Sequence, residues 1–273
     1  MADVDKDILA SLDTLEKEEG SLPRLLQFFR ELLNIQAGMK EKVRVPRIEN
    51  EEALRQRLEQ GLPLLDFNHI IIDMPLFQEH FARVVSIYSK YPDLFGEIPA
   101  AVTEAGRLIS GEAVIAWLTS GELPAAFSSS PALAQSVFLA VLRPWLVKYA
   151  TSLASLVDQD RWRRRVCPVC GGVPDFSFLD KERGSRWLVC SRCDTEWAFQ
   201  RLECPWCGCQ EPGQLAYLAD DQELYRVYTC QCCRKYVKTI DLRKTEQKVL
   251  LPLERLLTLD LDRQAQEKGF TAA

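Results

Sequence analysis

Residues 167–172 read CPVCGG, and residues 204–209 repeat the stretch almost unchanged as CPWCGC. Each copy leads into a segment of strand-like alternation with a charged turn. Each then closes with a second cysteine pair, Cys190/Cys193 in the first copy and Cys230/Cys233 in the second. All ten cysteines of the chain lie within this region. The region is therefore a duplicated module of about 35 residues, and such internal repetition constrains the fold.

The spacing of the cysteines is typical of metal ligands. A Cys-x-x-Cys pair lets two sulfurs converge on one ion from a tight turn, and the glycine after each pair can take the positive φ that such a turn needs. Two turns together complete a tetrahedral four-thiolate shell for zinc or iron. The repeat predicts a first site made of Cys167, Cys170, Cys190 and Cys193, and a second made of Cys204, Cys207, Cys230 and Cys233.

We therefore predict two bound metal ions, Fe or Zn, with folding coupled to metal binding because so small a β unit buries little core. A cross-braced pairing of the cysteines would break the repeat. Two cysteines, Cys209 and Cys232, are left over. The simpler interpretation makes them spare thiols beside the turns. The alternative is ligand exchange or redox chemistry, in which either Cys232 or Cys233 pairs with Cys230.

The first 160 residues show the period of amphipathic helices. Apolar residues recur at helical spacing in segments 3–20, 21–39, 49–61, 74–92, 99–118 and 131–157. After residue 165 the pattern changes to short segments with a period near two, rich in aromatic and β-branched residues, which predict strands. A last helix is expected from Pro252 to Gly269.

These patterns predict a multi-domain α+β protein. An all-α N-terminal domain over 1–160 would be followed by two tandem rubredoxin-like or zinc-ribbon four-cysteine modules, over 161–202 and 203–249, and by a C-terminal helix over 250–273. The formal net charge is -5, and residues 1–160 carry 15 Lys and Arg against 23 Asp and Glu. This acidic balance makes a nucleic-acid partner an unfavoured interpretation.

Other sequence features narrow the function further. The first residues, MADVDKDILASL, lack a secretory signal pattern, and the chain lacks an uninterrupted apolar run of 18 residues, so a cytoplasmic protein without a membrane partner is expected. There is no nucleotide-binding or metalloprotease motif, and no catalytic residues are assigned. His69 and His80 are expected to have satisfied structural roles. The tryptophans of the cysteine region are expected to form core, and the arginines at 161–165 to act at a protein interface.

The chain also resembles the family of formate dehydrogenase accessory proteins, the FdhE family. The resemblance is carried by CPVCGGVPDFSF at 167–178, SRWLVCSRCDTEWAFQRLECPWCG at 185–208, YTCQCCRKYVKTID at 228–241 and LLTLDLDRQAQEKGF at 256–270. It implies a cytoplasmic, non-enzymatic maturation factor that binds the catalytic subunit of a formate dehydrogenase and carries metal, iron in the family, at the same eight cysteines. The extra Cys232 departs from the family pattern, so that Cys232 and Cys233 are alternative ligands in the fourth pair. The oligomeric state is not predicted.

Two other functions fit the cysteine pattern. A rubredoxin-like electron-transfer protein would need a reversible iron couple. A zinc-ribbon protein that binds nucleic acid would show salt-sensitive binding, and the acidic net charge argues against it.

Overall fold

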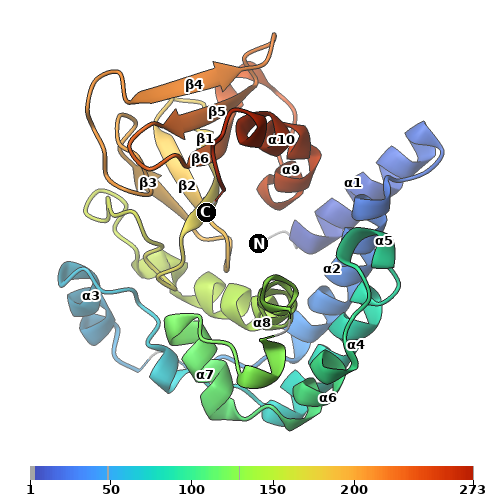
Figure 1. Cartoon of the computed structure of the whole chain (residues 1–273). Coiled ribbons are helices and arrows are strands. Elements are labelled where there is room, and N and C mark those ends of the chain that lie inside the picture. Colours follow the sequence, from blue (N-terminus) through green and yellow to red (C-terminus); the bar gives the residue numbers. More distant parts are fainter. Residues whose placement is uncertain (1–3, 48, 129, 273) are drawn as a thin grey trace. The chain divides into compact units, whose positions relative to one another are not determined.

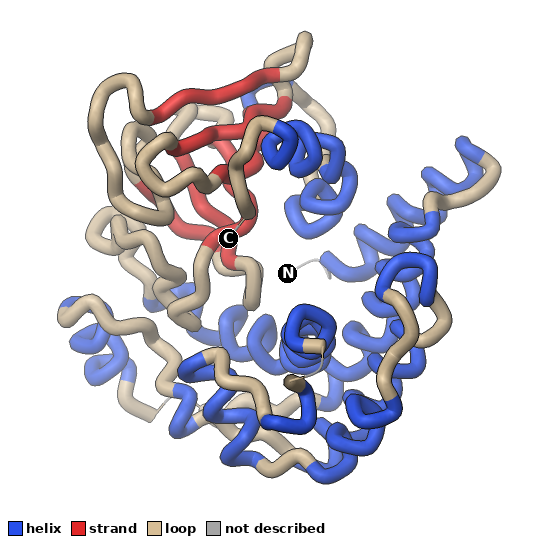
Figure 2. Tube along the Cα trace, viewed as in Figure 1, coloured by secondary structure: helices blue, strands red, loops and turns tan. Residues whose placement is uncertain are grey.

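The computed structural model describes residues 4–47, 49–128 and 130–272. In the described part of the chain, the elements before residue 157 are helices, the strands follow from residue 174 to residue 241, and further short helices come after the last strand (Figure 2). The chain forms two compact units: unit 1 contains Met1–Arg47 and Leu65–Tyr149, and unit 2 contains Ile48–Leu64 and Ala150–Ala273. The predicted α+β class is confirmed, with a helical N-terminal region, a sheet region with both cysteine clusters and a helical C-terminus.

Unit 1 is built from helices, labelled in Figure 1. Its elements are α1 (Val4–Glu19), α2 (Arg24–Lys42), η1 (Phe67–His69), α4 (Met74–Tyr88), α5 (Pro92–Phe95), α6 (Ala100–Leu108), α7 (Gly111–Ser120), η2 (Ala125–Phe127) and α8 (Pro131–Leu153), of which the last turn passes into unit 2. Residue 3, where the first predicted helix starts, lies outside the described residues. The segment predicted over 99–118 is two helices, because the chain is extended at Ile109 and Ser110 caps α7 by accepting a hydrogen bond from the Ala113 N–H.

The core of unit 1 forms between α4 and α8. Asp73 caps α4 by accepting a hydrogen bond from the Leu76 N–H, a favoured use of aspartate before a helix. Phe77 packs against Trp145 with ring centroids 6.1 Å apart, and Phe81 packs edge-on against Phe138 at 5.9 Å. These side chains are almost fully buried. The apolar residues that recur at helical spacing in this part of the sequence are therefore the residues that form the core.

One helix of the described residues is long and apolar enough to cross a membrane. The stretch Pro131–Leu156 has a mean hydropathy of 1.2 in its most apolar window, and 61% of that window is buried inside the protein. A buried core helix of a globular protein has the same composition. Burial of Val141, Leu142 and Leu146 places this helix in the core of unit 1.

Unit 2 is organised around a six-stranded sheet with the order β3-β2-β1-β6-β5-β4. Its strands are β1 (Pro174–Leu179), β2 (Arg186–Cys190), β3 (Glu196–Phe199), β4 (Leu215–Ala219), β5 (Tyr225–Cys230) and β6 (Tyr236–Asp241). Each module contributes an antiparallel three-strand meander. The meanders join through a parallel pairing of β1 with β6, in which Ser177 lies opposite Thr239.

Helices of the C-terminal segment cover one face of this sheet (Figure 1). Beside α9 (Leu251–Leu257), the side chains of Phe176, Phe178 and Ile240 form a buried cluster that Leu251 contacts. Beside α10 (Leu259–Glu267), Ala265 and the following Phe270 pack on β5 and β6. The sheet therefore has a small apolar core of its own in addition to the cysteine sites.

The C-terminal helix predicted from Pro252 to Gly269 is interrupted at Thr258, which ends α9 and precedes α10. The Thr258 hydroxyl donates a hydrogen bond to the Glu254 carbonyl. The buried ammonium of Lys238 donates hydrogen bonds to the Arg255 carbonyl at 2.8 Å and the Thr258 carbonyl at 3.4 Å. These contacts take up carbonyl groups around the break, which explains why one continuous helix is not formed.

The remaining parts of unit 2 precede the cysteines or lie between the main elements. They are α3 (Glu51–Glu59), η3 (Ala154–Leu156) and η4 (Leu242–Lys244). Asn50 caps α3 by accepting a hydrogen bond from the Ala53 N–H. The segment Ile48–Leu64 clusters with the cysteine region although it lies far from it in sequence. The four-part division predicted from the sequence, with bounds at 160, 202 and 249, stays a prediction.

Candidate metal centres

The first predicted set of cysteines comes together in the structure. Cys167 and Cys170 lie in the turn before β1, and Cys190 and Cys193 lie at the end of β2 and in the turn after it. The Sγ atoms of Cys167 and Cys193 are 3.6 Å apart, and those of Cys170 and Cys190 are 3.4 Å apart. All four residues are buried.

The second predicted set repeats this arrangement. The Sγ atoms of Cys204 and Cys233 are 3.7 Å apart, as are those of Cys207 and Cys230. Cys233, and not Cys232, lies beside Cys204, whereas Cys232 groups with Cys209 and Cys230. That Cys233 completes the second site stays a prediction. Within each set, all four sulfurs lie within 4.8 Å of one another.

The backbone of the turns explains why the sulfurs converge. In the first module the Gly171 N–H donates to the Cys167 carbonyl at 3.0 Å; in the second the Gly208 N–H donates to the Cys204 carbonyl at 3.0 Å. Both glycines have positive φ, 69° and 75°, a conformation that glycine adopts without steric cost. The glycine that follows each Cys-Pro-x-Cys pair thus closes the turn.

The second turns are also alike in the two modules. The Asp194 N–H donates to the Cys190 carbonyl, and the Arg234 N–H donates to the Cys230 carbonyl. Asp194 and Arg234 both have a φ of 58°, which is uncommon for residues other than glycine. The structural repeat therefore includes the backbone conformation as well as the cysteine spacing.

The donor sets fit a tetrahedral metal ion. A Zn–S bond of about 2.3 Å places neighbouring sulfurs of a tetrahedron about 3.8 Å apart. The four closest separations, 3.4 to 3.7 Å, agree with that edge length. Backbone N–H groups also point at the sulfurs, from Arg192 to Cys190 Sγ and from Trp206 to Cys204 Sγ, both at 3.4 Å. Both clusters can hold a metal ion, consistent with two Fe or Zn sites.

The crowded sulfurs affect one another's protonation. Hydrogen bonds from Cys167, Cys190 and Cys193, together with burial, raise the pKa of the Cys170 thiol well above its usual range. Burial raises the pKa of the Cys204 thiol. A thiol must lose its proton before it can act as a metal ligand, so binding a cation here releases protons and is favoured by rising pH.

The two sites differ in exposure to solvent. Every cysteine of the first site is buried, whereas in the second site Cys207 is exposed and Cys233 is half-buried. Cys209 and Cys232, which belong to neither set, are joined in a disulfide. Neither is therefore a spare thiol in this structure, and the simpler interpretation of these two cysteines is wrong.

The arginines that precede the first cysteine contact other parts of unit 2. Arg161 forms an ion pair with Glu59 of α3 at 3.3 Å. Arg165 donates a hydrogen bond to the Trp206 carbonyl at 3.1 Å, so it connects the two cysteine modules. Arg164 lies against Gly61. These contacts agree with the predicted interface role of the run, in this case between segments of the same chain.

Two of the four tryptophans of the cysteine region lie in the core as predicted, and the other two are half-buried. Trp162 and Trp197 are buried, and the Trp197 indole donates to the Arg164 carbonyl at 2.8 Å. Trp187 stacks on Phe178 with ring centroids 6.0 Å apart. Trp206 donates to the Tyr236 carbonyl at 3.3 Å. These contacts stabilise unit 2 directly.

The two histidines differ from each other and lie outside both clusters. The His69 side chain is 82% exposed and lies 3.2 Å from Asp66. His80 is fully buried, but neither ring nitrogen has a hydrogen-bond partner within the described residues. The expectation of a satisfied structural role is therefore wrong for His80. The sequence does not predict this, because a histidine on an apolar helix face can be buried either with or without hydrogen-bond partners.

The chain thus belongs to the class of mixed α and β proteins that combine a helical region with a sheet containing two four-cysteine clusters able to hold metal ions. The model of the FdhE central domain matches residues 166–201. A protein FdhE homolog from Aquifex aeolicus is 37% identical over 136 residues, 48% of this chain and 47% of that protein. Protein FdhE from Escherichia coli O1:K1 / APEC is 34% identical over 112 residues, 40% of this chain and 35% of that protein. The matches thus span about half or less of these curated relatives.

The chain is similar over nearly its whole length to the crystal structure of the FdhE protein from Pseudomonas aeruginosa. The TM-score is 0.61 at 25% sequence identity, over 98% of this chain and 91% of that chain. The family model, the curated relatives and the solved structure all support the FdhE family, and the resemblance predicted from the sequence is confirmed.

Proposed function

We propose that this protein is a cytoplasmic accessory factor that binds the catalytic subunit of a formate dehydrogenase and promotes its assembly or activity. The observation that carries the proposal is the pair of four-cysteine clusters in a chain that resembles the FdhE family over nearly its whole length. In this proposal the protein is not an enzyme. The ligands are Cys167, Cys170, Cys190 and Cys193 in the first site and Cys204, Cys207, Cys230 and Cys233 in the second.

The metals would first serve the fold. Each cluster joins the turn before its module's first strand to the turn after its second. The first site also receives contacts from the C-terminal segment, because Arg255 of α9 donates a hydrogen bond to the Cys190 carbonyl at 2.8 Å. A metal that holds these turns together therefore stabilises the surface that unit 2 presents to a partner.

The test is an affinity pull-down from the native host at low oxygen, with the tagged full-length protein as bait. We expect formate dehydrogenase subunits, identified by mass spectrometry, to co-purify with a bait that carries two metal ions per chain. The matched control bait carries Cys167→Ala and Cys170→Ala, which should lose one metal ion and most of the bound enzyme. Absence of every formate dehydrogenase subunit from a bait with intact metal content would refute the proposal.

A rubredoxin-like electron-transfer function is the second candidate, and the exposed Cys207 favours it because electron transfer needs a site near the surface. It requires iron at the second site with a reversible one-electron couple. A protein that contains zinc alone when isolated from its own host would exclude this function.

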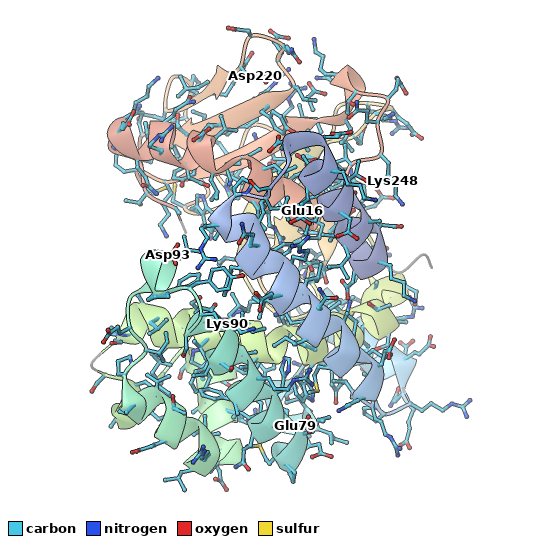
Figure 3. The ribbon with its side chains drawn as sticks, turned by 90° about the vertical axis from the view of Figure 1, so that its right-hand side faces the viewer. Glu16, Glu79, Lys90, Asp93, Asp220 and Lys248 are labelled. Atoms are coloured by element: carbon cyan, nitrogen blue, oxygen red, sulfur yellow. A yellow bond between two sulfur atoms is a disulfide. The ribbon has the colours of Figure 1, made fainter. Side chains whose placement is uncertain are left out.

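Nucleic-acid binding has less support, because the formal net charge of the chain is -5. The charged residues labelled in Figure 3 are of both signs, with Lys90 and Lys248 among Glu16, Glu79, Asp93 and Asp220. Of the arginines before Cys167, Arg161 and Arg163 form ion pairs with carboxylates of the same chain. A basic surface that would neutralise several phosphates is thus not formed by this run.

A further inference from the structure

Two cysteines outside the predicted ligand sets connect the two turns of the second site. Cys209 lies two residues after Cys207, and Cys232 lies directly before Cys233. The structure joins them in a disulfide with Cα atoms 6.6 Å apart. Their sulfurs also lie within 4.8 Å of the sulfur of Cys230. The disulfide therefore bridges the same two turns that a metal ion at the second site would bridge.

The contact between these two positions follows from the fold of the module, because the first module makes it without cysteines. Gly172 and Arg192 are the equivalent residues there. The Cys167 N–H donates to the Gly172 carbonyl at 2.8 Å, and the Cys204 N–H donates to the Cys209 carbonyl at 2.9 Å. A Cβ atom on Gly172 would lie 3.1 Å from Cδ of Arg192. Both modules thus bring these positions together, and only the second fills them with thiols.

The pair is open to reagents from solution. Cys232 is exposed and Cys209 is half-buried, whereas the neighbouring Cys230 is buried. Thiol–disulfide exchange requires an attacking sulfur that the incoming reagent can reach. Cys232 is the sulfur that meets this condition first, and Cys209 is placed to complete the reaction from the other turn.

We propose that Cys209 and Cys232 form a reversible thiol–disulfide pair, which locks the second four-cysteine site when oxidised and opens it to ligand exchange when reduced. The effect on the site rests on the proposed second metal site. The redox chemistry of the pair does not depend on it, nor on a formate dehydrogenase partner.

The oxidant is a low-molecular-weight disulfide such as glutathione disulfide. The thiolate of Cys232 attacks one sulfur of that disulfide; its S–S bond breaks, a mixed disulfide forms on Cys232, and one glutathione leaves as thiol. The thiolate of Cys209 then attacks the Cys232 sulfur, and the second glutathione leaves. Two electrons and two protons pass from the pair of protein thiols to the two glutathione molecules, and reduced glutathione in excess reverses both steps.

The Cys209–Cys232 disulfide is expected to slow the release of metal from the second site, because it holds the two turns of that site together. In the oxidised protein the two turns stay joined when one ligand sulfur detaches, so rebinding is fast. In the reduced protein this covalent link is absent, and the thiols of Cys209 and Cys232 lie close enough to Cys230 to compete with it as ligands. We expect metal release from the second site to be about tenfold slower in the oxidised protein. A covalent link between two otherwise separate modules would slow release more, but here the strands already hold the two turns close to each other.

The experiment uses the full-length protein loaded with two zinc ions and kept without oxygen in buffers of varied glutathione ratio. Free thiols are trapped by alkylation and the peptides are analysed by mass spectrometry. Zinc release is followed with a chromogenic chelator. We expect a disulfide-linked Cys209–Cys232 peptide to form as the share of oxidised glutathione rises and to disappear as that share falls. Of the two phases of zinc release, one should become slower as this disulfide forms. The other phase serves as an internal control, because the first module has Gly172 and Arg192 at these positions.

A Cys232→Ser variant should release zinc from both sites at rates that do not depend on the glutathione ratio. The inference is overturned if Cys209 and Cys232 stay alkylated at every ratio, if they pair with other cysteines, or if the disulfide forms while both zinc-release phases are unchanged. Because the wild-type titration is itself decisive, a folding defect in the variant would not remove the test. A failed pull-down would leave this result standing, so the two proposals fail separately.

Discussion

Arg255 connects helix α9 to the first four-cysteine site, and its removal is the sharpest test of how that site is supported. Its guanidinium donates to Asp194 at 2.6 Å and to the Cys190 carbonyl at 2.8 Å, and forms an ion pair with Asp175 at 3.1 Å. Burial alone would lower the pKa of Arg255, but the two carboxylates outweigh it and leave the pKa raised. The side chain is only 11% exposed.

The expected loss of stability depends on how far Arg255 and its two carboxylate partners are exposed to water. Removing one partner of a buried ion pair costs about 3–5 kcal/mol. Asp194 and Asp175 are 22% and 38% exposed, so water can replace part of the lost interaction. We therefore expect Arg255→Met to destabilise the first site by about 2–3 kcal/mol. If zinc leaves through local opening of the turns, about 2 kcal/mol corresponds to roughly 30-fold faster release.

The assay is zinc release to a chelator, combined with hydrogen exchange of residues 190–199 and 251–257 followed by mass spectrometry. The matched control is Arg263→Met on α10, where the ion pair with Asp260 has a similar length of 2.9 Å but its side chains are 70% and 78% exposed. That variant should change stability by less than about 0.5 kcal/mol. Faster exchange of α9 with unchanged zinc release from both sites would refute the reasoning, because it would show that Arg255 holds the helix without supporting the metal site.

Two further predictions concern buried positions. Gly172→Ala would place a Cβ atom 3.0 Å from Cys190 Sγ and 3.2 Å from Cys170 Sγ, so we expect metal binding at the first site to weaken by about 1–3 kcal/mol. Competition titration with cobalt checks this, and two unchanged affinities would contradict it. Burial, with smaller contributions from Arg83 and Lys42, lowers the pKa of His80 from 6.5 to about 4. The unfolded chain therefore binds an extra proton below pH 6.5, and unit 1 should lose up to about 3 kcal/mol of stability between pH 6.5 and 4. Hydrogen exchange of α4 should show this loss in the wild type and not in His80→Leu; parallel losses would count against it.

The cysteine clusters were predictable from the sequence because their geometry is local. A Cys-x-x-Cys turn with a following glycine fixes two sulfurs within a few residues, and the repeat matches one pair with the next. The helical period predicted the core of unit 1 for the same reason, since Phe77 and Phe81 lie one turn apart on α4. Local spacing carries this information without knowledge of the tertiary fold.

The features that the sequence did not predict depend on long-range contacts. The parallel pairing of β1 with β6 joins residues about sixty positions apart. The break at Thr258 depends on Lys238, a residue of a different element. The pairing of Cys209 with Cys232 requires both turns of the second site to be in place. Periodicity within one segment contains no information on these partners.

The differences between the two sites suit different tasks within the proposed function. Structural metal sites are closed, and the first site has this character, with buried cysteines and a buried arginine at its Cys190 turn. The second site has an exposed ligand, Cys207, and the Cys209–Cys232 pair beside it. Because β1 of the first module pairs with β6 of the second, the sheet stays connected through backbone hydrogen bonds when the second site changes state. A redox response confined to that site would therefore alter one part of unit 2 and leave the fold that the first site supports intact.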